Sequence, residues 1–328
     1  MRFLFATGQT HMPYQVSGAA RSLHTLLSML CEHGHECEAV VGLQRGWRQP
    51  VLRAMMFWSA RRCLALSDWQ NVYQTHRTLR PRIAALAARR MEAFHPDVVM
   101  TQLDRGREVT ELALRRGLLV TLSVHDAVLD RGIWPRPHPR LKFVTNSEFI
   151  ASRVRNHLGL ESTVIYPVIR LESYKVSSRV PEFITFVNPV REKGVDLALE
   201  IAARVPKRRF LFVESWRVGE KERRRLQEDL KQLSNVTFAP WTNDMRTVYS
   251  RTALLIVPSQ WEEAFARVAL EAQVSGIPVV ARDIGGIGEV LRESGILLPQ
   301  NAAAEAWAQT IERLLSDQSF YAACSAAA

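Results

Sequence analysis

The sequence of 328 residues has no apolar run that approaches the roughly 18 residues needed to cross a bilayer, so it predicts no transmembrane helix. Its first residues, Met-Arg-Phe-Leu-Phe-Ala, are too few for a secretory signal and lead into a predicted strand. The four cysteines are unevenly spaced, which indicates reduced thiols rather than a disulfide framework. Together these absences predict a cytoplasmic protein.

One cluster of metal-binding residue types is present, and it consists of Cys31, His33, His35 and Cys37. Cys31 is predicted to end a helix, Gly34 to form a turn, and Cys37 to face inward from a strand. Four ligands within seven residues, divided between a helix and a strand, cannot easily surround one tetrahedral zinc ion. We therefore expect no metal site here.

Acidic residues and lysines are scarce in residues 45–90, which contain ten arginines, no lysine and a single acid, Asp68. Arginine interleaved with aromatic residues suits phosphate-rich partners such as an anionic membrane surface. A solvated, Arg-rich helical face explains the same pattern equally well, so peripheral attachment to the inner face of the membrane stays an open alternative. No nucleic-acid-binding motif is present, so no nucleic-acid partner is expected. The interleaved aromatic residues are Trp47, Phe57, Trp58, Trp69 and Tyr73.

Length and composition predict two domains of ordinary size, with 47% hydrophobic and 23% charged residues. Short apolar runs alternate with helical periodicity along both halves, which predicts an α/β fold with parallel sheets and a boundary near residue 170. Strands are expected near residues 2–7, 37–42, 95–100, 118–124, 141–146, 162–165, 182–187, 209–213, 236–239, 253–257, 279–280 and 296–298. Helices are expected at residues 18–32, 50–66, 80–93, 147–157, 195–203, 221–233, 242–249 and 302–315.

The most informative stretch follows the apolar run at residues 253–257, which Pro258 closes as a buried strand. The pattern then becomes helical until Gly276. A strand that leads into a helix start offers backbone N–H groups to an anion. Glu263 lies at the junction of loop and helix, and Glu271 lies one to two turns inside, so their Cα atoms are at most ~12 Å apart. A carboxylate only accepts hydrogen bonds, so each can take two hydroxyl protons of a vicinal diol.

The two glutamates belong to a longer pattern. It comprises Pro258-Ser259, Glu263, seven intervening residues, Glu271, Ala272, Gly276, Pro-Val-Val at 278–280 and Gly-Gly-Ile at 285–287. This pattern resembles that of family-4-type retaining glycosyltransferases with the GT-B fold. The resemblance implies two Rossmann-like domains that face each other across a cleft. Residues 1–170 would form the acceptor-side domain, and residues 171–328 would bind a nucleotide sugar.

The sequence departs from the family pattern in three loops. Family members usually have Glu-Gly-Phe-Gly, where glycine lets a phosphate approach the backbone, whereas this chain has Ala264 and Ala266. Asn188 stands where an arginine usually precedes the lysine–glycine pair, and Ser17 replaces one of two glycines, next to Gly18. The family's last helix, which crosses back onto the first domain, is expected to be short, truncated or missing.

The resemblance implies four residues at the reacting centre. Glu263 would hold hydroxyls of the donor sugar, and Lys193 would neutralise the diphosphate as charge builds on the leaving group. Arg191 is the candidate to replace the missing arginine. His125, at the end of a predicted strand, matches a family histidine that faces the transferred sugar, although a histidine at a polar strand end explains it equally well.

The resemblance also implies a set of donor-binding residues. Glu271 would hold the ribose, and the backbone amides near Phe265 and Ala266 would bind the diphosphate. Arg267 and Gly18 complete the residues expected to contact the donor.

The implied reaction moves a hexose-type sugar from a UDP- or GDP-sugar to an acceptor hydroxyl, with no metal ion and no cofactor beyond this co-substrate. The leaving phosphate would deprotonate the acceptor, and the anomeric configuration would be kept. The acceptor would be a glycan, a lipid-linked molecule or a small molecule. Two alternatives remain: a GT-B nucleotide-sugar epimerase, and a non-catalytic protein that binds nucleotide sugars or anionic membranes.

Overall fold

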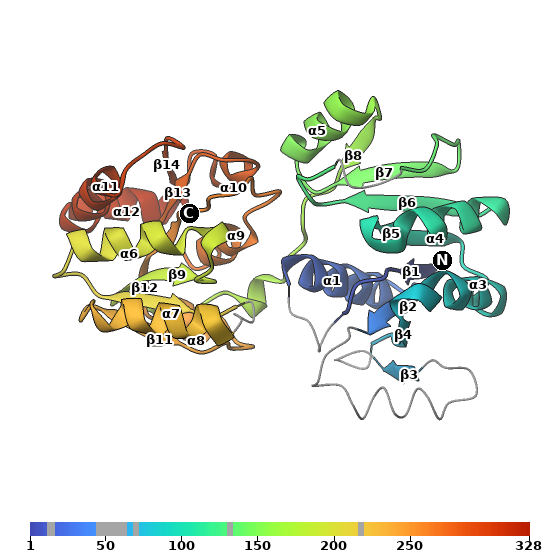
Figure 1. Cartoon of the computed structure of the whole chain (residues 1–328), viewed down its shortest axis with the longest axis horizontal. Helices are drawn as coiled ribbons and strands as arrows, with labels where there is room; N and C mark the ends of the chain where they lie inside the picture. Colours follow the sequence, from blue (N-terminus) through green and yellow to red (C-terminus); the bar gives the residue numbers. More distant parts are fainter. Residues whose placement is uncertain (12–16, 44–63, 68–71, 130–133, 216–219) are drawn as a thin grey trace. The chain divides into compact units, whose positions relative to one another are not determined.

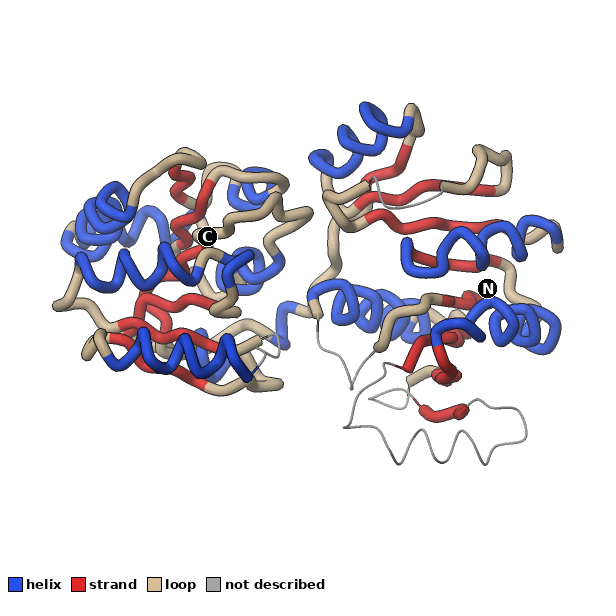
Figure 2. Tube along the Cα trace, in the orientation of Figure 1, coloured by secondary structure: helices blue, strands red, loops and turns tan. Residues whose placement is uncertain are grey.

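The computed structural model describes residues 1–11, 17–43, 64–67, 72–129, 134–215 and 220–328. The chain divides into two compact units, Met1–Val168 and Ile169–Ala328 (Figure 1). Each unit is a largely parallel β-sheet with helices packed on it, as the separation of strands and helices in Figure 2 shows. The prediction of an α/β fold made of two Rossmann-like domains is confirmed.

The first unit contains an eight-stranded sheet with the order β3-β4-β2-β1-β5-β6-β7-β8. All neighbouring strands are parallel except β3, which pairs antiparallel with β4. The strands are β1 (Arg2–Ala6), β2 (Glu36–Leu43), β3 (Leu64–Ser67), β4 (Gln74–Leu79), β5 (Val98–Gln102), β6 (Leu119–Val124), β7 (Leu141–Thr145) and β8 (Ser162–Val164). The helices are α1 (Gly18–Glu32), η1 (Arg80–Arg82), α3 (Ile83–Phe94), α4 (Leu103–Arg115) and α5 (Glu148–Leu158).

The second unit contains a six-stranded parallel sheet with the order β11-β10-β9-β12-β13-β14. Its strands are β9 (Phe183–Val187), β10 (Phe210–Val213), β11 (Val236–Ala239), β12 (Thr252–Val257), β13 (Val279–Arg282) and β14 (Ile296–Leu298). Its helices are η2 (Leu171–Ser173), η3 (Arg191–Lys193), α6 (Val195–Arg204), α7 (Glu220–Lys231), α8 (Arg246–Tyr249), α9 (Arg267–Gln273), α10 (Ile287–Leu291), α11 (Ala304–Ser316) and α12 (Gln318–Ala327).

The strand order of each sheet reverses at one point. In the second unit β9 lies beside β12. The strands that follow β9 in the sequence lie on one side of this pair, and the strands that follow β12 lie on the other. In the first unit the same happens between β1 and β5. Ligands of doubly wound sheets bind beyond the carboxyl ends of the strands at such a point. In the second unit, a ligand site is therefore expected at the loops after β9 and β12.

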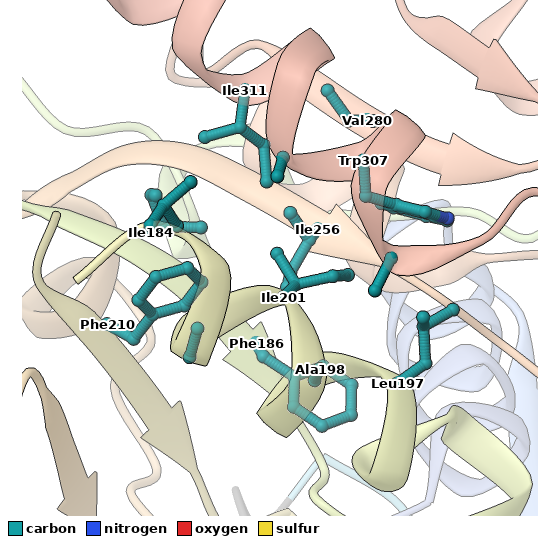
Figure 3. Close-up of a cluster of buried hydrophobic side chains, with 14 of the residues drawn as sticks. Ile184, Phe186, Leu197, Ala198, Ile201, Phe210, Ile256, Val280, Trp307 and Ile311 are labelled. Atoms are coloured by element: carbon teal, nitrogen blue, oxygen red, sulfur yellow. The ribbon is translucent and has the colours of Figure 1, made fainter. Parts of the chain in front are cut away.

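Alternating side chains cover both faces of the second sheet. Ile184 and Phe186 of β9 and Val280 of β13 point to the face covered by α6 and α11, where Trp307 is fully buried (Figure 3). On the other face, β12 and β13 pack against α9 and α10. Burial on both faces explains why these strands appear in the sequence as continuous apolar runs.

Two serine side chains cap helices of the first unit. The Ser17 side chain accepts a hydrogen bond from the backbone N–H of Ala20 at the start of α1, and Ser147 does the same for Ile150 at the start of α5. Each satisfies one of the free N–H groups of a first helical turn.

Three predicted elements need correction. Of the helix expected at residues 50–66, the last part belongs to strand β3, and residues 44–63 lie outside the described residues. The helix expected from Thr242 is reduced to α8, because the Thr242 hydroxyl accepts from the Asp244 backbone N–H and closes a turn. The central helix is also shorter than predicted, because α9 begins only at Arg267. The chain after α11 forms the further helix α12, whose Tyr321 hydroxyl donates to the Ala253 carbonyl of the same unit.

Cys31 and Cys37 occupy the predicted helix end and strand. Burial raises the pKa of the Cys37 thiol well above its usual range, and a hydrogen bond from Cys31 adds to the effect. A raised pKa opposes the thiolate that a zinc ion requires. Within the described ranges, no three His, Cys, Asp or Glu side chains come together as a metal-binding group.

Several residues of the Arg-rich segment at 45–90 lie inside the first unit. Tyr73 is 5% exposed, and its hydroxyl lies 2.7 Å from His11 Nε2 and 3.0 Å from His24 Nδ1. Arg77 is 1% exposed, and Arg90 pairs with Glu38. Tyr73 and Arg77 therefore belong neither to a solvated helical face nor to a membrane-binding surface. Its other aromatic residues lie outside the part of the chain that the structure describes.

The buried His11 predicts a loss of stability in mild acid. Burial, Arg77 and His24 together lower the pKa of His11 to about 3. A folded-state pKa below the unfolded value of about 6.5 means that the stabilisation is complete above that value and is lost as the pH falls. The free energy of unfolding, measured with urea, should fall by about 2 kcal/mol from pH 7 to pH 5 through this group. In His11→Gln this fall should largely vanish, and an unchanged slope would refute the assignment.

Candidate donor-binding site

The loop after β9 and the loop after β12 meet at the switch point of the second unit. Gly194 has φ +85°, a left-handed conformation that favours glycine, and a Cβ atom there would lie 2.0 Å from the Pro258 carbonyl oxygen. The Gln260 N–H also donates to the Glu192 carbonyl at 2.9 Å. These contacts bring Lys193 and Glu263 to the same place although 70 residues separate them.

Lys193 and Glu263 form a direct ion pair, with 2.5 Å between Nζ and Oε1. The buried Ser259 hydroxyl donates to the same carboxylate oxygen at 2.6 Å. Lys193 Nζ also lies 4.8 Å from the centre of the half-exposed Trp261 ring, within cation–π range. The described residues offer no partner to the second oxygen of Glu263, so this oxygen can accept a hydroxyl of a ligand.

The glycine pair after β13 supports the backbone of Glu263. Gly285 has φ +64°, and a Cβ atom there would lie 2.4 Å from the Glu263 carbonyl oxygen. The Gly286 N–H donates to that same oxygen at 2.7 Å. Side chains larger than hydrogen at these positions would displace the loop that carries Glu263.

The two alanines that replace the usual glycines fit the backbone of this loop. Ala266 has φ −74°, and neither Ala264 nor Ala266 adopts a positive φ. Ala266 is 3% exposed and packs in the hydrophobic core beneath α9. The backbone therefore does not require glycine at either position, and the methyl group of Ala266 is buried in this core.

Glu271 lies in α9 within a buried polar network. Its Oε1 accepts from Arg267 Nε at 2.9 Å, and its Oε2 accepts from the Tyr249 hydroxyl at 3.3 Å. A carboxylate has about four lone-pair positions, so about two remain for the hydroxyls of a ligand such as ribose. Burial and the nearby Glu271 raise the pKa of Tyr249, which keeps its phenol protonated and able to donate.

Arg267 is 8% exposed and has a second contact, because its Nη2 donates to the Tyr174 hydroxyl at 3.1 Å. Burial disfavours its charge, but Glu271 and Tyr174 outweigh this effect and raise the pKa of the guanidinium. Arg267 therefore stays charged and is committed to neighbouring side chains.

The remaining predicted site residues are not part of the Lys193–Glu263 or Arg267–Glu271 contacts. Arg191 is exposed, and its nearest acidic partner is Asp196 at 4.0 Å, so it does not contact Glu263. Phe265 is half-buried in the loop before α9. His125 and Gly18 belong to the first unit, where His125 follows β6 and Gly18 begins α1 after the β1 loop. Burial lowers the pKa of His125, with Asp126 opposing, so its imidazole is neutral at pH 7.

Sequence reasoning assigned no role to three residues here. Ser259 and Tyr249 orient the two glutamates, and only the Pro-Ser pair of the motif pointed toward one of them. Arg282 ends β13, is 9% exposed, and donates from Nη1 to the Gln260 side chain at 3.1 Å. Its Nε has no partner among the described residues, and burial lowers the pKa of the guanidinium.

The second unit resembles a known protein family. Residues 181–317, most of the second unit, match the family model described as glycosyl transferases group 1. D-inositol 3-phosphate glycosyltransferases of Mycobacterium tuberculosis and Mycobacterium bovis are 32% identical over 229 residues, which cover 59% of this chain and 47% of the relative. The chain thus spans about half the length of the curated relatives it matches.

Solved structures define the fold as GT-B. HepE of Anabaena in complex with UDP matches with a TM-score of 0.75 at 17% identity, covering 100% of this chain and 93% of HepE. Sucrose-phosphate synthase of Thermosynechococcus elongatus matches with a TM-score of 0.73 at 18% identity, covering 99% and 92%. WaaG, a glycosyltransferase involved in lipopolysaccharide biosynthesis, matches with a TM-score of 0.71 at 14% identity, covering 100% and 94%. At these identities the likeness concerns the fold.

Proposed function

We propose that this protein is a family-4-type retaining glycosyltransferase that moves a hexose-type sugar from a nucleotide sugar to an acceptor hydroxyl. The observation that carries the proposal is the pair of charged networks, Lys193–Glu263 and Arg267–Glu271, beside the switch point of the second sheet. The match of this unit to a glycosyl transferase model supports it. UDP or UDP-glucose bound to the structural neighbour HepE makes a UDP-sugar the first donor to test.

The two networks bind different parts of the donor. Glu271, already oriented by Arg267 and Tyr249, offers its remaining lone pairs to the ribose. Lys193 exchanges its contact with Glu263 for the diphosphate, and it supplies positive charge where other enzymes use a divalent ion. The freed Glu263, still held by Ser259, accepts hydroxyls of the sugar. The bond from the anomeric carbon to the phosphate oxygen breaks, that phosphate takes the acceptor's proton, and the acceptor oxygen bonds on the same face.

A donor screen followed by product analysis tests the proposal. Thermal unfolding should shift upward with one of UDP-, GDP- or dTDP-sugars, because specific binding stabilises the folded state by ~2.7 kcal/mol at a hundredfold excess over Kd. Transfer should then proceed in the presence of EDTA. The proton coupling of the product's anomeric hydrogen should show the configuration of the donor.

Each alternative gives a different result. An epimerase would change the sugar without an acceptor, and a non-catalytic binder would show the thermal shift without turnover. An inverted product would contradict retention. The absence of any shift with nucleotide sugars or nucleotides would contradict the donor site itself.

Attachment to an anionic membrane is a separate proposal, supported by the arginines at 53, 61 and 62 and their aromatic neighbours in sequence. These residues lie outside the described ranges, and no helix within those ranges is long and apolar enough to span a bilayer. Electrostatic attachment predicts binding to anionic vesicles that weakens as salt rises. Changing Arg53, Arg61 and Arg62 to serine should reduce it. Equal binding to neutral and anionic vesicles in a flotation assay would contradict the proposal.

A further inference from the structure

The network around Glu271 continues beyond the proposed ribose site. Arg267 donates in two directions, from Nε to Glu271 Oε1 at 2.9 Å and from Nη2 to the Tyr174 hydroxyl at 3.1 Å. Glu271, Arg267 and Tyr174 are all less than 10% exposed. A planar guanidinium with two fixed bonds has little freedom left, so its position also determines that of the carboxylate.

Tyr174 is itself firmly held. Its backbone carbonyl accepts from the Ser275 hydroxyl at 2.8 Å, and that hydroxyl accepts from the Val176 N–H at 2.9 Å. Ser275 lies just beyond α9, the helix that carries Glu271. The segment at residues 171–176, near the start of the second unit, is thus joined to α9 at both Arg267 and Ser275.

We propose that Arg267 is a positioning residue rather than a donor contact, and that it and Tyr174 form a relay from the ribose-binding carboxylate to the segment at residues 171–176. The inference rests on the proposed donor site. Tyr174 fixes Arg267, Arg267 fixes Glu271, and the carboxylate meets the ribose hydroxyls without having to reorient. Occupation of the site in turn restrains the segment that Tyr174 belongs to, because both ends share one set of hydrogen bonds.

Tyr174→Phe tests the relay without uncovering a buried charge, because the Arg267–Glu271 ion pair and the aromatic ring remain. The Kd of UDP and of GDP is measured by calorimetry, together with that of their 2′,3′-dideoxy forms, which lack the hydroxyls that Glu271 would hold. Whichever nucleotide binds the wild type should bind the variant about 3- to 10-fold more weakly, the range for loss of one hydrogen bond. The dideoxy form should bind both proteins equally.

Two further variants complete the test. Arg267→Lys keeps the charge but cannot donate in both directions, so it should match Tyr174→Phe, and the double variant should show no further loss. Tyr321→Phe is the control, since it also removes a partly buried hydroxyl contact, to the Ala253 carbonyl, and should leave the Kd unchanged. Nucleotide should also slow amide exchange at residues 171–176 in the wild type and not in Tyr174→Phe.

The outcomes separate the relay from the donor site. Equal affinity of Tyr174→Phe and Tyr321→Phe for a nucleotide that the wild type binds would overturn the relay and leave the proposed function intact. An equal loss for the ribose and dideoxy forms would also overturn it, because the effect would not pass through Glu271. If the wild type binds neither UDP nor GDP, the relay fails, and the proposed function fails with it when dTDP does not bind either.

Discussion

Lys193→Ala is expected to lower kcat for sugar transfer by about 100-fold or more, the usual cost of removing one well-placed electrostatic contact. The reason lies in its position, since Nζ stands 2.5 Å from Glu263 at the end of the sheet where the diphosphate would lie. Charge on the leaving phosphate grows as the sugar bond breaks, so the loss falls mainly on the transition state. Glu263→Gln should also be slow, because it keeps the shape and the Ser259 contact but removes the charge.

Lys207→Ala and Glu200→Gln are matched controls. Both change an exposed charge of the second unit: Glu200 lies within α6, and Lys207 lies between α6 and β10. They should retain the wild-type kcat. Initial rates at saturating donor, with thermal midpoints measured alongside, would separate a catalytic effect from a folding defect. Full turnover by Lys193→Ala and Glu263→Gln, when both are folded, would show that the assignment is wrong.

Most of the second unit could be predicted from the sequence, because its strands are buried on both faces. Runs such as Phe183–Val187 and Thr252–Val257 are apolar except for one threonine each, and each is followed by a turn residue and a helical pattern. Hydrophobic periodicity therefore located these strands to within one or two residues.

Strand β4 was not predicted, because its sequence, Gln-Thr-His-Arg-Thr-Leu, is mostly polar. Its His76 is buried only because Nε2 lies 3.0 Å from the Glu38 carboxylate of the neighbouring strand, which in turn pairs with Arg90 of α3. Burial of this kind depends on a partner that is distant in the sequence, and hydrophobic periodicity carries no information about such pairs.

In the candidate site, too, the sequence predicted individual residues but not their contacts. The motif identified Glu263 and Glu271, and the lysine–glycine pair identified Lys193, because each has a fixed place beside a strand end. The contacts that set their chemistry came only from the fold: Lys193 reaches Glu263 across 70 residues, and Tyr174 reaches Arg267 across 93. Gly194 approaches the Pro258 carbonyl and Gly285 approaches the Glu263 carbonyl, both in the loop after β12. Both glycines have a left-handed backbone, and neither carries a Cβ atom that would prevent this close approach.

The buried pair of Arg267 and Glu271 makes Glu271→Ala a test of stability as well as of binding. Arg267 is 8% exposed in the wild type. The change leaves its guanidinium buried without the carboxylate that pairs with it, and breaking a buried ion pair in this way costs roughly 3–5 kcal/mol. A chemical denaturation curve should therefore show a large loss of unfolding free energy. Glu271→Ala should also raise the donor KM, because a contact with the ribose is lost, and this rise has to be corrected for the loss of folded protein.

The double variant Arg267→Met, Glu271→Gln should recover most of that stability, since no unpaired charge stays buried and methionine fills much of the arginine's volume. It should still bind the nucleotide poorly, because the carboxylate for the ribose is gone. Glu305→Ala, which breaks the more exposed contact with Arg204, is the control and should cost at most about 1 kcal/mol. If Glu271→Ala proves no more costly than Glu305→Ala, the guanidinium is not held as a buried partner of Glu271. If the double variant binds nucleotide as tightly as the wild type, Glu271 does not hold the ribose.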